Sequence, residues 1–147
     1  MTGTKKAIPR PPRDDAEASH RPQGGEQSRK IALLAAEAGL DKKASGVEII
    51  FVGDKVDYAD YLVLMSGASD RNVSAIAKEV DATLSNAGFT PMSVEGLPSA
   101  QWVLIDFVDV VVHVFQRDAR SLYDLDGLWM DAARIPVPGA DNVPTEV

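Results

Sequence analysis

Five consecutive apolar residues near the middle of the chain, 61–65, constrain the fold more than any other feature. The run extends from Tyr61 to Met65, so a strand here would present apolar side chains on both of its faces. Such a strand lies inside a sheet that helices cover. At 147 residues, the chain has room for one such domain and not for a second core.

A long amphipathic helix is predicted after this strand. Apolar residues recur at helical spacing between Val73 and Ala87, and Gly88 stands where a helix commonly ends. The opposite face is polar and is expected to be solvated. Periodicity that switches between strand and helix is typical of an α/β or α+β domain.

The turn between this strand and this helix has two readings. Backbone N–H groups of residues 66–69, at the start of a helix, could hold a phosphate. No glycine-rich phosphate-binding motif accompanies the turn, however, and Ser69 or Asp70 would cap the helix well. We therefore assign Ser66, Gly67, Ser69 and Arg71 to folding and helix capping.

A β-hairpin is predicted farther along the chain, where the apolar runs 102–105 and 110–115 flank four residues. Together with strands at 47–52 and near 91–94, this gives a sheet of about five strands. A first helix should begin near Gln27 or Ser28. Two short helices should close the domain, at about 119–123 and 125–129.

Both ends of the chain lack a pattern that would bury them. Residues 1–28 contain four prolines, two adjacent glycines and many charges, which predicts a disordered basic tail. Residues 136–147 combine proline with short apolar and then polar residues, which predicts an extended C-terminal tail. The domain is therefore predicted to span residues 29–135.

Charge is divided unevenly along the chain. Residues 1–30 carry seven basic and four acidic side chains, whereas residues 31–147 carry eight basic and eighteen acidic ones. A folded part this acidic argues against binding DNA or wrapping RNA through phosphate neutralisation.

The absence of cysteine excludes disulfides and thiolate chemistry and agrees with a reducing cytoplasm. No apolar run approaches the roughly 18 residues that span a bilayer, so we predict neither export nor membrane insertion.

Few residues suggest a catalytic or metal-binding role. Asp106 and Asp109, at the two ends of the predicted hairpin turn, could bind a divalent cation, but aspartate is also a favoured turn residue and we favour the turn. His113 lies in an apolar strand without a neighbouring nucleophile, so a packed, hydrogen-bonded core histidine is expected. Trp129 is most simply a lid over the core. We predict no catalytic residue, metal or cofactor.

Three blocks of the sequence, in this order, resemble the ribosomal silencing factors, also called the Iojap-like family. They comprise 60–71 with 75–77, then 95–96 with 102–107 and 109–115, and finally Arg120 with 122–125 and 128–129. The resemblance covers about residues 29–135.

This resemblance implies a single α/β (α+β) domain with a mixed sheet flanked by helices, a nucleotidyltransferase-like topology and no established catalytic role. It also implies binding to a ribosomal protein on the intersubunit face of the large subunit, which blocks joining of the small subunit when nutrients are scarce. We therefore expect a cytoplasmic translational repressor and not an enzyme. An acidic domain would be attracted to a basic ribosomal protein and repelled by bare ribosomal RNA.

The expected interface residues lie in the second and third blocks. Trp102 would be an aromatic anchor, Leu104 an apolar contact, and Asp106 with Asp109 acidic partners of lysine or arginine. Tyr123 is a further candidate. An exposed strand edge could also serve a homodimer.

The hairpin turn departs from the family at Val108, where glycine is usual. Because a β-branched residue is strained at positive φ, we expect Val108 to keep a negative φ in a type I turn or a longer connection.

The alternative to a translational repressor is a small magnesium-dependent nucleotidyl or phosphoryl transferase, with Asp106 and Asp109 beneath the Ser66 turn. The turn offers no lysine to grip a phosphate, and no third carboxylate follows at a clear spacing.

Overall fold

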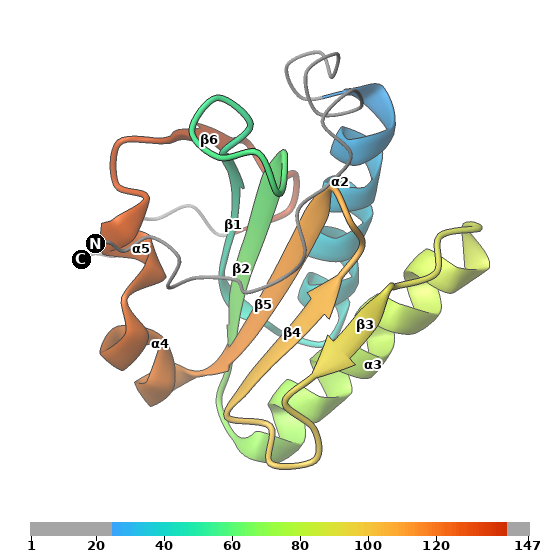
Figure 1. The fold of residues 1–147 in the computed structure, drawn as a ribbon. Helices are drawn as coiled ribbons and strands as arrows, with labels where there is room; N and C mark the ends of the chain where they lie inside the picture. Colours follow the sequence, from blue (N-terminus) through green and yellow to red (C-terminus); the bar gives the residue numbers. More distant parts are fainter. Residues whose placement is uncertain (1–24, 141–147) are drawn as a thin grey trace.

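The computed structural model describes residues 25–140, and Figure 1 shows their arrangement. The elements, in chain order, are α2 (Glu26–Asp41), β1 (Ser45–Phe51), β2 (Tyr61–Gly67), α3 (Asp70–Asn86), β3 (Ser93–Glu95), β4 (Trp102–Asp106), β5 (Val110–Gln116), α4 (Arg117–Tyr123), α5 (Leu125–Leu128) and β6 (Ala133–Ile135).

All six strands form one mixed sheet in the order β3-β4-β5-β2-β1-β6. The pair β2 and β5 is parallel, and every other neighbouring pair is antiparallel. Strand β2 lies in the interior of the sheet and is buried at every position, as the apolar run predicts. The mixed α/β domain is thereby confirmed, while the nucleotidyltransferase-like topology stays a prediction.

Helices cover the two faces of the sheet unequally (Figure 1). Helices α2 and α3 pack on one face, where Val63 and Met65 belong to the larger core cluster. The short helices α4 and α5 lie on the other face, where Leu62 and Leu64 belong to a smaller cluster. Alternate residues of β2 therefore enter two different cores, which explains why the strand is apolar on both faces.

Helix α3 ends and begins where the sequence indicates. Ser69 is its N-cap, and its Oγ accepts a hydrogen bond from the Asn72 N–H at 3.1 Å. Gly88 follows the helix with a φ of +94°, a conformation that costs glycine little. Both predictions are confirmed.

The predicted limits of the domain need correction at both ends. Helix α2 begins at Glu26, inside the predicted tail, because Ser28 is buried and its hydroxyl donates to Asp60 Oδ2 at 2.9 Å. Val137, in the predicted C-terminal tail, is buried in the larger core cluster. Residues 1–24 and 141–147 lie outside the described part of the chain.

The sheet also has a sixth strand that the periodicity does not predict. Strand β6 has only three residues and pairs antiparallel with β1 at the edge of the sheet. A segment this short and largely exposed carries no alternation of apolar and polar residues from which a strand could be recognised.

The expectation for Val108 is wrong, because its φ is +78°. The Asp109 N–H donates to the Phe107 carbonyl at 3.0 Å, as in a γ-turn centred on Val108. The Val108 N–H donates to Asp106 Oδ1 at 2.7 Å, and the Asp109 carbonyl accepts from the backbone N–H of Asp60 at 2.7 Å. Contacts on both sides of Val108 thus impose a conformation that its side chain disfavours.

Candidate functional site

A groove of about 510 Å³ lies between strand β4 and the short helices α4 and α5. Its lining consists of the side chains of Trp102, Tyr123, Asp124, Leu125 and Leu128. Tyr123 is 49% exposed and Leu128 is 40% exposed, although both are large and apolar in most of their surface. Exposed aromatic and aliphatic groups around a groove are typical of a protein-binding surface.

Aromatic rings form the wall of this groove on the side of the sheet. The ring centroids of Trp102 and Tyr123 are 4.4 Å apart, and those of Trp102 and Phe115 are 5.2 Å apart. Trp102 lies directly opposite Phe115 in the antiparallel pair β4 and β5, so the two side chains share one face. The half-buried indole is thus held between a core phenylalanine and an exposed tyrosine.

His113 lies beside this indole and is fully buried. The Trp102 Nε1–H donates a hydrogen bond to His113 Nδ1 at 2.9 Å. Burial lowers the pKa of the His113 imidazole from its ordinary value of 6.5 to about 3, so the ring is neutral at physiological pH. Because Nδ1 accepts this bond, the single ring proton of the neutral form is on Nε2.

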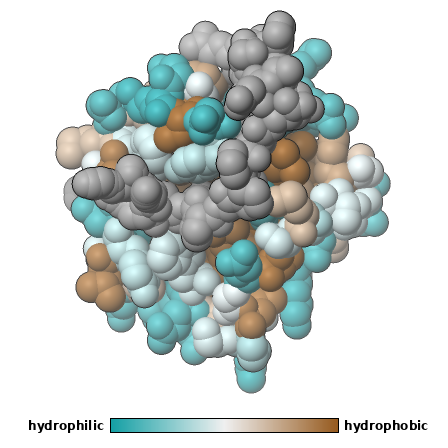
Figure 2. Space-filling view, viewed as in Figure 1, coloured by the Kyte–Doolittle hydropathy of each residue, from teal (hydrophilic) through white to brown (hydrophobic). Residues whose placement is uncertain are grey.

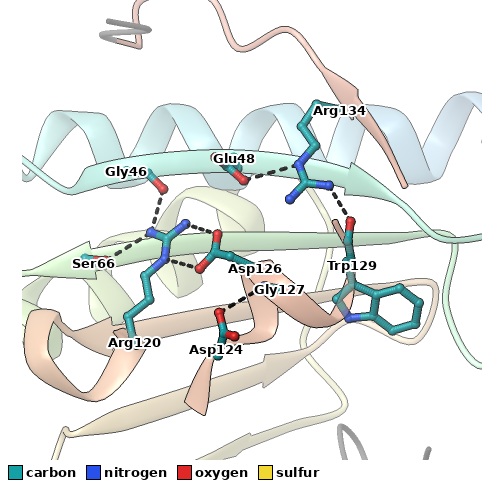
Figure 3. A network of polar contacts seen from close by, with 9 residues as sticks. All are labelled: Gly46, Glu48, Ser66, Arg120, Asp124, Asp126, Gly127, Trp129 and Arg134. Carbon is teal, nitrogen blue, oxygen red and sulfur yellow. Dashed lines mark hydrogen bonds and ion pairs between the residues drawn. The ribbon is translucent and has the colours of Figure 1, made fainter. Parts of the chain in front are cut away.

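Arg120 connects α4 and α5 to the sheet, as Figure 3 shows. Its Nε and Nη2 donate to the two carboxylate oxygens of Asp126, each at 2.9 Å. Its Nη1 donates to the Gly46 carbonyl at 2.6 Å and to Ser66 Oγ at 3.0 Å. Burial would raise the pKa of the Asp126 carboxyl, but the hydrogen bonds and charge of Arg120 outweigh it and lower that pKa. One guanidinium therefore joins both short helices to β1 and β2.

Arg134 makes a second connection at the end of α5 (Figure 3). Its Nη1 donates to the backbone carbonyls of Trp129 and Ala132, and its Nε donates to Glu48 Oε1 at 3.4 Å. The chain that follows α5 is thereby attached to β1. Since α4 and α5 have only seven and four residues, these side-chain contacts hold them in place more than helix propensity does.

The structure brings together some of the predicted interface residues and separates others. Trp102 and Tyr123 meet in the groove, and Leu104 is half-buried on the same face of β4 as Trp102. Asp106 is only 3% exposed and its carboxylate accepts from the turn backbone, so it forms the turn rather than offering an exposed charge. Asp109 is half-buried.

The turn before α3 uses its backbone N–H groups internally. The Ala68 N–H donates to Asn72 Oδ1 at 2.9 Å, and the Val73 N–H donates to the Ser69 carbonyl at 2.9 Å. A Cβ at Gly67 would lie 2.9 Å from the Val73 nitrogen, so the helix start packs too closely for a side chain there. This arrangement is that of a helix cap, and it gives the phosphate reading no support.

Other predicted residues take structural positions. Ser66 is buried and accepts from Arg120, Arg71 is exposed in the first turn of α3, and Trp129 is buried in the smaller core cluster. Within residues 25–140, no group of three or more histidine or acidic side chains could hold a metal ion. No helix in that range is long and apolar enough to cross a membrane.

Sequence reasoning did not assign a role to Arg120, although it belongs to the third matched block. Its partners Gly46 and Ser66 are 74 and 54 residues away along the chain, so no local spacing could indicate the contact. The combination of Arg120 with Asp126, six residues later, is the only signal in the sequence, and an exposed ion pair would look the same.

Comparisons with known proteins test the resemblance over the whole domain. Residues 25–146 match the model of a protein family described as "Ribosomal silencing factor during starvation". The chain is 40% identical over 104 residues to "Ribosomal silencing factor RsfS" of Bacillus subtilis. The aligned region covers 71% of this chain and 88% of that relative. A crystal structure of a Chromobacterium violaceum protein, 30% identical, superposes with a TM-score of 0.68 over 80% of this chain and 98% of that one.

A more distant mouse relative is named "Mitochondrial assembly of ribosomal large subunit protein 1". It is 28% identical over 102 residues, which covers 67% of this chain and 42% of the relative.

Proposed function

Because this chain belongs to the ribosomal silencing factor family, we propose that it binds a basic protein on the intersubunit face of the large ribosomal subunit. Once bound there, it prevents the small subunit from joining and so represses translation in the cytoplasm under nutrient limitation. It acts by occupying space and turns over no substrate.

The observation that carries this proposal is the groove between β4, α4 and α5. Its exposed apolar surface includes Tyr123 and Leu128, and Leu122 on α4 is 78% exposed. Figure 2 shows that apolar residues reach the visible face of the molecule in separate patches between polar ones. A central aromatic group with a mixed rim is the usual composition of a protein-binding site.

Acidic groups near the groove favour a basic partner. Asp124 lines the groove, and Glu95 is exposed on β3 directly opposite Leu104, so it lies on the same face of the sheet. The domain as a whole has a large excess of acidic side chains, with eighteen against eight basic ones in residues 31–147. Charges of this sign accelerate association with a basic surface, and added salt screens the effect.

The name of the mouse relative supports the large subunit as the binding platform, since that protein is named for assembly of this subunit. A homodimer is not part of the proposal. The two edge strands of the sheet, β3 and β6, have three residues each, and edges this short offer little for pairing with a second copy.

Sedimentation with purified bacterial ribosomal subunits tests the proposal. The full-length protein should co-migrate with large subunits and not with small ones, and its addition before the subunits are mixed should reduce the yield of joined particles. Co-migration with neither subunit, or an unchanged yield of joined particles, would refute it.

Substitution of the anchor tests the surface. We expect Trp102→Ala to weaken binding to large subunits by about 2 kcal/mol or more, because it removes the ring against which Tyr123 packs. Phe89→Ala is the matched control, since Phe89 is also a half-buried aromatic but lies against α2, on the opposite face of the sheet. Urea unfolding of both variants shows how much of any loss comes from the fold. Equal loss of binding in the two variants would contradict this surface.

A further inference from the structure

We propose that His113 is a positioning residue for partner binding, because its Nδ1 atom holds the indole of Trp102 in the orientation that forms the groove. The inference rests on the proposed function of that groove. His113 itself is fully buried and lies beneath the surface, so it acts through Trp102 and not by contact with the partner.

The geometry assigns one clear interaction to His113. It lies diagonally across from Trp102 on the same face of the β4 and β5 pair, and the indole N–H reaches its Nδ1 at 2.9 Å. The imidazole is stacked with Phe115 at an interplanar angle of 10°, which restrains the acceptor itself. A restrained acceptor can select one orientation of the indole, because the terminal torsion of a tryptophan side chain is otherwise broad.

Packing of the core does not require a histidine at position 113. Its neighbours on the same face of β5, Val111 and Phe115, are apolar and fully buried, and Leu104 lies directly opposite on β4. Within the described part of the chain, His113 Nε2 is buried without a hydrogen-bond partner. Burying a donor in this way is unfavourable, so an apolar side chain would pack here at least as well. What histidine adds is the acceptor for Trp102.

The orientation of Trp102 decides the shape of the groove. One side of the indole packs on Phe115, and Tyr123 packs against it with a centroid distance of 4.4 Å. If the indole rotated, Tyr123 would lose this support and the wall of the groove would change. A side chain that is fixed before binding loses less conformational entropy when the partner arrives, which increases affinity.

The experiment compares two substitutions of His113 in the full-length protein. Leucine removes the acceptor and fills the site with an apolar side chain, whereas asparagine keeps an acceptor oxygen near the position of Nδ1. Each is made with Trp102 present and in a Trp102→Phe background, which has no indole N–H. Two quantities are measured: the dissociation constant for purified bacterial large ribosomal subunits and the free energy of unfolding in urea. The indole N–H resonance of Trp102 reports the hydrogen bond directly.

We expect His113→Leu to raise the dissociation constant about tenfold without a parallel loss of stability, and His113→Asn to restore much of the affinity. In the Trp102→Phe background, the same His113→Leu change should have little further effect on binding. The indole N–H resonance should shift in the leucine variant and lie closer to its original position in the asparagine variant.

Two results would overturn the inference while leaving the proposed function intact. In the first, His113→Leu binds as tightly as the unchanged protein. In the second, it weakens binding equally with and without the indole N–H, or only as much as it lowers stability, which marks a packing role. If the unchanged protein does not bind large subunits, the proposed function fails and this inference fails with it. Should the leucine variant not fold, His113→Phe gives the same comparison.

Discussion

Acidification should destabilise this protein through His113. In the folded protein, burial lowers the pKa of His113 from 6.5 to about 3, whereas in the unfolded chain the imidazole regains its ordinary pKa of 6.5. Between these two values the unfolded state binds a proton that the folded state does not. Stability therefore rises with pH across this window, and the contribution of His113 is constant above pH 6.5.

The magnitude follows from the width of the window. Each pH unit below 6.5 should reduce the free energy of unfolding by about 1.4 kcal/mol through this single group. At pH 5 the loss relative to pH 7.5 should be about 2 kcal/mol, which is a large fraction of the stability of an ordinary domain.

The assay is urea unfolding followed by far-UV circular dichroism at several values between pH 7.5 and pH 5. His113→Leu is the control, because it keeps every other titrating group, including His20 and Asp126. The difference in unfolding free energy between the two proteins should change by about 2 kcal/mol across this range, in favour of the variant at low pH. If the two curves stay parallel, His113 is not buried in its neutral form and the reasoning is refuted.

Two further substitutions test the turn and the attachment of the short helices. Val108→Gly should raise the unfolding free energy by about 1 kcal/mol in urea, because glycine adopts a φ of +78° without strain; a glycine variant less stable than Val108→Ala would contradict this. Arg120→Met should lower that free energy by about 3 kcal/mol, since Ser66 and Asp126 lose a part-buried partner. Lys55→Met, which removes an exposed ion pair at 3.5 Å, should cost less than 1 kcal/mol by the same measurement, and equal losses would refute the role of Arg120.

Much of the fold could be predicted from local patterns. The interior strand 61–65, the helix capped by Ser69 and the hairpin around 106–109 all appear where periodicity and capping residues place them. These elements are specified by residues within a few positions of one another, and burial on one or both faces leaves a direct trace in the order of apolar residues. The family resemblance extended this reading to the function of the domain.

The limits of the domain were harder to predict, because the structure of the segments at its two ends depends on contacts with residues far away in the sequence. Ser28 is part of α2 partly because Asp60, 32 residues away, accepts a hydrogen bond from its hydroxyl group. Strand β6 exists because it pairs with β1 at the edge of the sheet, and its own three residues carry no pattern. At Val108, the hydrogen bond from the distant Asp60 N–H to the Asp109 carbonyl acts together with bonds inside the turn, and these contacts override the preference of the valine side chain.

The sequence by itself determined an acidic α/β domain with a central apolar strand, and it identified Trp102 and Tyr123 as candidates for an interface. Only the tertiary structure joined these two rings into one groove, placed His113 beneath the indole and attached α4 and α5 through Arg120. The physical reason is the range of the interactions. Apolar periodicity is set by near neighbours in the chain, whereas a binding surface depends on side-chain contacts between segments that only the folded sheet brings together.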